Sequence, residues 1–249
     1  MKNISNNEAG DKLIFALDAA GLDEALSWID LLSGHVGMFK VGKELFTACG
    51  PKIVDCIKLR GQRVFLDLKF HDIPNTVARA AESAVKLGVD MFNVHASGGS
   101  KMIAETVKAV DAFAARNGMV KPIVLAVTVL TSLNDADLQE IGFAKTTNDQ
   151  VLHLAAMAKA AGADGVVASP QDIAALRARM GNDFILVTPG IRSSQEAVQD
   201  DQKRTLSAQE AVQLGADYLV VGRPIRQAAD PLAACRNIVQ EIAAGMTAG

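Results

Sequence analysis

Three charged residues close together in one stretch of the chain have the types and spacing to do chemistry. Residues 64–77 read V-F-L-D-L-K-F-H-D-I-P-N-T-V, and they contain Asp67, Lys69 and Asp72. Strand alternation would put Asp67 and Lys69 on one face of a strand that is otherwise apolar. Nearby carboxylates favour the charged form of a lysine, which makes Lys69 a poor base but a ready acid. The pattern therefore predicts loss of an anion followed by proton delivery, and its alternative is a structural ion pair at a strand end.

This stretch belongs to a regular alternation of short β-rich runs with longer helical patterns. Eight strands, each followed by helix, in 249 residues predict an α/β fold of the (β/α)₈ TIM barrel type. A doubly wound sheet has the same alternation, but the first strand lacks G-x-G-x-x-G. We expect a single domain over 1–249, with 1–11 as a flexible N-terminal extension. The predicted strands cover 13–17, 36–41, 64–70, 91–94, 123–129, 165–168, 184–187 and 218–221.

Polar residues gather where these strands end, and that end of a barrel carries its chemistry. Each has an alternative explanation: Asp18 and Thr131 can cap helices, Lys40 can extend along the surface, and His95 can be a hydrogen-bonded core residue. Their shared position favours an active site. The set consists of Asp18, Lys40, Asp67, Lys69, Asp72, His95, Thr131, Arg192 and Arg223.

The loops after the seventh and eighth strands predict a phosphate site. Gly190 and Gly222 allow close approach of the backbone to phosphate oxygens, and Arg192 and Arg223 follow them within two residues. The substrate expected from this pattern is a phosphate monoester. The polar stretch 193–205 is either a solvated loop or a lid that closes over the phosphate.

Composition excludes several other classes of function. A net charge of −3 gives no basic surface for nucleic acid, and no apolar run reaches the length of a membrane span. The N-terminus lacks the apolar core of a signal peptide, so we expect a cytoplasmic protein. The three cysteines have no C-x-x-C spacing and the histidines are scattered, which predicts neither disulfides nor a metal site.

The motifs together resemble orotidine 5′-phosphate decarboxylase of the bacterial type, from the first predicted strand to the eighth. The resemblance implies cofactor-free decarboxylation of orotidine 5′-phosphate to UMP, the last step of de novo UMP synthesis. The similar motifs are D-L-K-F-H-D-I-P-N-T at 67–76, L-D at 17–18, F-K-V-G at 39–42, T-P-G-I-R at 188–192, D-Q at 201–202 and V-G-R-P-I at 221–225.

The resemblance also implies a role for each matching residue. Lys69 would protonate C6 of the pyrimidine, Asp67 would lie beside the departing carboxylate, and Lys40 and Asp72 would complete an array of alternating charges. Asp72 and Thr76 would reach the active site of a second subunit, which implies a homodimer. The remaining substrate contacts would be Asp18 and Lys40 to the ribose, Thr131 with Ser132 to the pyrimidine, and Arg192, Gln202, Gly222 and Arg223 to the phosphate, with Gln195 and Gln199 as alternatives to Gln202.

Two other functions stay open on the sequence. A magnesium-dependent sugar-phosphate decarboxylase or aldolase of the same barrel group shares D-x-K-x-x-D, but it places an acidic metal ligand where this chain has Lys40. A non-catalytic nucleotide-binding barrel would keep the phosphate site without the chemistry. Activity that needs a divalent cation would indicate the first, and UMP binding without turnover would indicate the second.

Overall fold

The computed structural model describes residues 6–191 and 206–247 and has the α/β fold expected from the sequence. Its eight strands form a closed parallel barrel in the order β1 to β8, so the doubly wound alternative is wrong. The strands are β1 (Leu13–Ala16), β2 (Met38–Gly42), β3 (Val64–Phe70), β4 (Met91–His95), β5 (Ile123–Val127), β6 (Gly165–Val167), β7 (Ile185–Pro189) and β8 (Tyr218–Val221).

Helices follow the strands along the chain, and short 3₁₀ turns cover Ala96–Gly98 and Pro170–Asp172. In the part that the structure describes, no helix combines the length and apolar character needed to cross a membrane. The helices are α1 (Asn6–Asp11), α2 (Leu22–Leu32), α3 (Lys43–Cys49), α4 (Lys52–Leu59), α5 (Pro74–Lys86), α6 (Gly99–Asn117), α7 (Asp135–Glu140), α8 (Thr147–Ala160), α9 (Ile173–Met180), α10 (Ala208–Gln213), α11 (Arg223–Arg226) and α12 (Pro231–Thr247).

The contacts within the chain define two compact units, the first made of 1–67 with 188–249 and the second of 68–187. In the first unit all four residues of β1 are buried, as expected for a parallel strand covered on both faces. Phe15 of β1 packs edge-on against Phe39 of β2, with ring centroids 6.2 Å apart. The ring of Trp28 in α2 also packs against Phe15, with centroids 5.6 Å apart. These contacts place β1 and β2 firmly beside each other, which matters because both carry predicted site residues near their ends.

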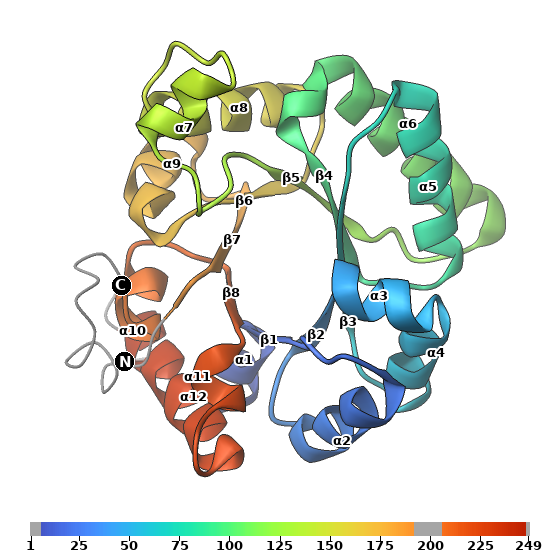
Figure 1. Cartoon of the computed structure of the whole chain (residues 1–249), viewed down its shortest axis with the longest axis vertical. Helices are drawn as coiled ribbons and strands as arrows, with labels where there is room; N and C mark the ends of the chain where they lie inside the picture. The colour runs from blue at the N-terminus through green and yellow to red at the C-terminus, as the bar shows by residue number, and fades with distance from the viewer. Residues whose placement is uncertain (1–5, 192–205, 248–249) are drawn as a thin grey trace. The chain divides into compact units, whose positions relative to one another are not determined.

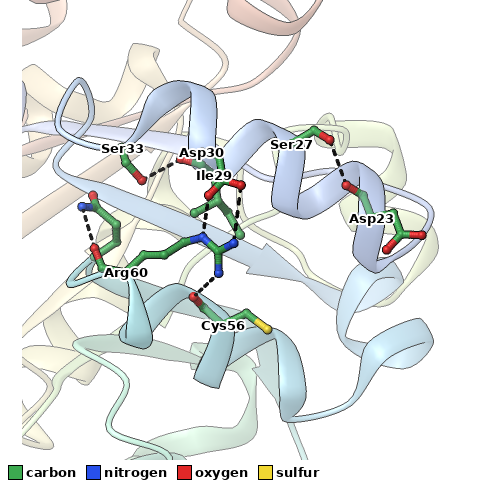
Figure 2. A network of polar contacts seen from close by, with 8 residues as sticks. Asp23, Ser27, Ile29, Asp30, Ser33, Cys56 and Arg60 are labelled. Atoms are coloured by element: carbon green, nitrogen blue, oxygen red, sulfur yellow. Dashed lines mark hydrogen bonds and ion pairs between the residues drawn. The ribbon is translucent and has the colours of Figure 1, made fainter.

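A surface ion pair joins two helices of the first unit (Figure 2). The guanidinium of Arg60, just after α4, donates to both carboxylate oxygens of Asp30 in α2, at 2.6 and 3.4 Å, and to the carbonyl of Cys56 at 3.2 Å. The hydrogen bond from Arg60 lowers the pKa of Asp30. The pair lies at the surface, and its role is to join α2 to the end of α4.

In the second unit, α5 and α6 lie side by side (Figure 1), and both follow strands that carry polar residues at their ends. Pro74 occupies the first turn of α5, as expected from its fixed backbone angle. Phe70 at the end of β3 packs against Phe92 of β4 at 6.0 Å. The β3–α5 connection therefore starts from a packed strand end.

Several strand boundaries differ from the sequence expectations by one or two residues, and two differences concern the first part of the chain. Residues 6–11, expected to belong to a flexible extension, form α1, in which Ala9 is fully buried. The second strand begins at Met38, two residues later than predicted. At Gly37 a side chain would collide with the backbone of Asp11, so the chain passes too close to α1 there for another residue type.

Candidate active site

Asp18, Lys40 and Asp67 form a charged group in the first unit. The Lys40 ammonium lies 3.5 Å from Oδ1 of Asp18 and 3.3 Å from Oδ2 of Asp67. The side chains of Lys40 and Asp67 are each 12% exposed, whereas that of Asp18 is 46% exposed. A lysine thus lies between two carboxylates, one shielded from water and one accessible to it.

Strand pairing accounts for this arrangement. Lys40 pairs with Ala16 of β1, and Gly42 at the end of β2 pairs with Asp67 of β3. A side chain at Gly42 would come 3.3 Å from the Lys40 ammonium, so glycine leaves room for the charged group. Because β1, β2 and β3 are parallel, their carboxyl ends lie together, and Asp18, Lys40 and Asp67 lie near those ends.

The structure rules out the alternative explanations for Asp18 and Lys40 that the sequence left open. Helix α2 is preceded by Gly21 as its N-cap, so Asp18 does not cap it. Lys40 is not a surface lysine, because its side chain is largely buried and paired with carboxylates. Both residues instead have the charge pairing expected of a functional site, and Lys40 is also shielded from water.

A cavity of about 280 Å³ lies beside the charged group in the first unit. A Cβ at Gly222 would lie 3.1 Å from that of Ala16, so the chain passes close to β1 just after β8. Gly190 has a φ of 82°, which favours glycine. The loops after β7 and β8 thus line one cavity, whose walls are Ala16, Asp18, Lys40, Pro189, Gly190, Ile191, Val220, Gly222, Arg223, Pro224 and Gln227.

Arg226 links the cavity to the charged group, and the sequence analysis missed it. Its guanidinium donates a hydrogen bond to the backbone carbonyl of Asp18. Arg226 ends α11, the short helix that begins at Arg223 in the cavity wall. The spacing R-P-I-R was visible in the sequence, but nothing in it indicated that the second arginine contacts the backbone near β1.

The second unit holds Lys69, whose backbone is unusual. Lys69 has a φ of 54°, and among the described residues it is the only non-glycine residue with a positive φ. Its backbone N–H donates to Oδ1 of Asn93 at 2.8 Å, and Asn93 is 1% exposed in β4. The predicted proton donor therefore has the kind of strained backbone that is concentrated at functional sites.

The other predicted residues of this unit lie in exposed segments. Asp72 is exposed, and its Oδ1 accepts from the backbone N–H of Ile73 at 2.6 Å. Thr76 is exposed in the first turn of α5. Thr131 lies in an exposed turn before α7. The N-cap of α7 is Asn134, so Thr131 does not cap this helix.

His95 ends β4, and its ring lies against that of His71, with centroids 5.5 Å apart. His71 follows β3 immediately, in the segment that leads to Asp72. The ring contact therefore joins the end of β4 to the segment that follows Lys69.

Two predicted residues lie outside the described part of the chain. These are Arg192 and Gln202, together with the alternatives Gln195 and Gln199 and the proposed lid 193–205. Within residues 6–191 and 206–247, no group of three or more histidine, cysteine, aspartate or glutamate side chains is arranged to hold a metal ion.

Comparison with known proteins decides the family. The family model described as orotidine 5′-phosphate decarboxylase / HUMPS family matches residues 11–238. The chain belongs to this family. Members named orotidine 5′-phosphate decarboxylase include one from Syntrophus aciditrophicus (strain SB), 60% identical over 248 residues that cover 99% of both chains. Another, from Geotalea daltonii, is 53% identical over 97% of this chain and 100% of its own.

Solved structures of the orotidine 5′-phosphate decarboxylase family show the same fold. The crystal structure of the enzyme from Lactobacillus acidophilus is 39% identical, with a TM-score of 0.82, and the match covers 92% of this chain and 98% of that one. The enzyme from Pyrococcus horikoshii OT3 is 26% identical, with a TM-score of 0.73 over 93% of this chain and 99% of its own. The resemblance seen in the sequence motifs is therefore confirmed over nearly the whole chain.

Proposed function

We propose that this chain decarboxylates orotidine 5′-phosphate without a cofactor, with Lys69 as the proton donor within an array of Lys40, Asp67, Lys69 and Asp72. The activity follows from the family match and from relatives at 50–60% identity that carry this name. The chain is a carboxy-lyase that forms UMP. What the structure adds is support for the roles of individual residues.

The observation that carries the proposal is the position of Lys40 between two carboxylates beside a cavity. Its ammonium lies within 3.5 Å of both Asp18 and Asp67. A divalent cation held by these carboxylates would meet that ammonium and be repelled. The charged group therefore supports the cofactor-free reaction over the magnesium-dependent alternative.

The cavity supplies a place for the phosphate and ribose. Its lining includes Gly222 and Arg223 together with Asp18 and Lys40. We propose that Arg223, with Arg192 and Gln202, binds the phosphate, since a guanidinium matches phosphate geometry. Asp18 and Lys40 then contact the ribose hydroxyls, and Thr131 contacts the pyrimidine.

The proposed chemistry is a proton-coupled loss of carbon dioxide. The bond between C6 and the carboxyl carbon breaks, its electron pair stays on C6, and an ammonium proton of Lys69 passes to C6. The neutral amine then regains a proton from water. Asp67 disfavours the substrate carboxylate beside it, while fixed positive charge stabilises the developing carbanion, and preorganised stabilisation of this kind is usually the largest catalytic effect.

We further propose a homodimer in which Asp72 and Thr76 of one subunit reach the active site of the other. The segment that carries them is exposed, and Ile73 within it is 67% exposed although it is large and apolar. An interface would bury this side chain. Ile73→Asp should convert a dimer into monomers by light scattering and abolish activity, whereas an active monomer would contradict the shared site.

A single barrel domain over 1–249 and a cytoplasmic location complete the proposal. The match of the family model to residues 11–238 supports one domain. The three cysteines are all free, as is usual in reducing compartments.

The test is the ultraviolet absorbance change of orotidine 5′-phosphate mixed with purified protein, with and without excess chelator. Conversion to UMP at the same rate in both samples is the expected result. Activity that disappears with chelator would indicate the magnesium-dependent reaction. Tight UMP binding by a folded protein without conversion would indicate the non-catalytic barrel.

A further inference from the structure

A buried asparagine contacts the backbone of the proposed proton donor. Asn93 lies in the middle of β4, where its neighbours Met91, Phe92 and Val94 are all fully buried and apolar. Its side-chain carbonyl oxygen accepts the backbone N–H of Lys69 at 2.8 Å. A polar side chain is costly in such a strand unless it is hydrogen-bonded, so a strand built for packing alone would carry an apolar residue here.

The backbone of Lys69 explains why this contact matters. At a φ of 54° the residue is in the left-handed region, which residues with a Cβ rarely adopt outside turns and functional sites. Rotation about φ sets the direction of the Cα–Cβ bond relative to the preceding peptide plane. The hydrogen bond that the Lys69 N–H donates to Asn93 holds that plane, and so it fixes the point from which the lysine side chain departs.

We infer that Asn93 is a positioning residue, which holds Lys69 in its left-handed conformation so that the ammonium is placed for proton transfer. The inference rests on the proposed role of Lys69. Asn93 acts through the lysine backbone and needs no contact with the substrate. Removing it should therefore slow the chemical step and leave substrate binding nearly unchanged.

The test compares steady-state kinetics and UMP affinity for the wild type and Asn93→Ala. We expect kcat to fall about 10- to 100-fold, because small displacements of a catalytic group have effects of this size. KM for orotidine 5′-phosphate and the Kd of UMP should each stay within about threefold of the wild type. If the alanine variant does not fold, Asn93→Leu fills the same space without an acceptor and should show the same loss of kcat.

Asp164→Ala is the matched control. Asp164 also uses a side-chain oxygen to accept a strand N–H at 2.8 Å, that of Val124, in the same unit. This variant loses a similar hydrogen bond but should keep the wild-type kcat. An equal fall of kcat in both variants would show general destabilisation and overturn the inference.

Two further results separate the positioning role from the role of Lys69. An inactive Lys69→Ala beside a folded Asn93 variant with kcat within threefold of the wild type would overturn only the inference about Asn93. A Lys69→Ala variant that still turns over would overturn the proposed function. A crystal structure of Asn93→Ala in which Lys69 keeps a φ near 54° would also contradict the positioning role.

Discussion

Replacing Lys40 by methionine should destabilise the protein and abolish its activity. Methionine keeps most of the lysine stem and removes the ammonium that lies 3.3 Å from Asp67 and 3.5 Å from Asp18. Asp67 is only 9% exposed, so its charge is poorly compensated by water once the ammonium is lost. The variant therefore separates the electrostatic contribution of Lys40 from its packing.

The magnitude follows from the two distances and the burial of each partner. A pair of unit charges at 3.3 Å attracts by about 5 kcal/mol at an effective dielectric constant of about 20. Dehydration of the ammonium offsets part of this attraction, and removing one partner of a buried pair costs about 3 kcal/mol. The contact with the half-exposed Asp18 adds less than about 1 kcal/mol. We expect a total loss of about 3 kcal/mol in the free energy of unfolding at pH 7.5.

Urea denaturation measured by circular dichroism tests this value, and the midpoint should fall by about 1 M. The matched control is Lys101→Met, since the side chain of Lys101 is 80% exposed and lies 3.9 Å from Glu105. We expect that control to stay within about 0.5 kcal/mol of the wild type. A Lys40→Met protein as stable as the control would show that Lys40 and Asp67 are not a strongly coupled buried pair.

Three other groups give independent predictions. Burial raises the pKa of Asp172 to about 6, so its stabilising contribution is present below the unfolded value near 4 and is lost as pH rises through 6. Asp172→Asn should therefore gain up to about 3 kcal/mol in unfolding free energy over the wild type at pH 7.5 and only about 0.5 kcal/mol at pH 4. A gain independent of pH would contradict this. Burial also raises the pKa of the Cys235 thiol to about 11. Iodoacetamide at pH 8 should therefore modify Cys49 in the native protein well before Cys235, which mass spectrometry can measure. Equal rates of modification would show that Cys235 is not buried. Arg226→Ala should raise KM about fivefold with kcat nearly unchanged, because the backbone carbonyl of Asp18 loses the hydrogen bond from the guanidinium. An unchanged KM in steady-state kinetics would show that this hydrogen bond does not position Asp18 for substrate binding.

The fold was predictable because its strands are apolar runs of the right length between helical patterns. β8 has the bounds expected from the sequence, and β5 begins where expected but ends two residues early. The helix α1 was missed because its sequence, N-N-E-A-G-D, has no apolar period. Its buried residue, Ala9, contributes too little hydrophobicity to be noticed in a sequence.

The charged group was predictable in part because strand ends in parallel sheets converge. That reasoning placed Asp18 and Lys40 at one edge, and in the structure the Lys40 ammonium lies 3.5 Å from Oδ1 of Asp18. It could not predict the backbone of Lys69, since lysine has no special preference for a positive φ and strand alternation assumes ideal geometry. The partner that holds this backbone, Asn93, is 24 residues away along the chain. Contacts of that kind depend on register between strands and have no local signal.

The role of Lys69 is tested by measuring turnover by Lys69→Ala, with UMP binding measured by calorimetry on the same sample. We expect a folded protein that binds UMP and converts no detectable orotidine 5′-phosphate, because no other group is assigned to protonate C6. Substantial residual decarboxylation by this variant would contradict the central claim that Lys69 is the proton donor.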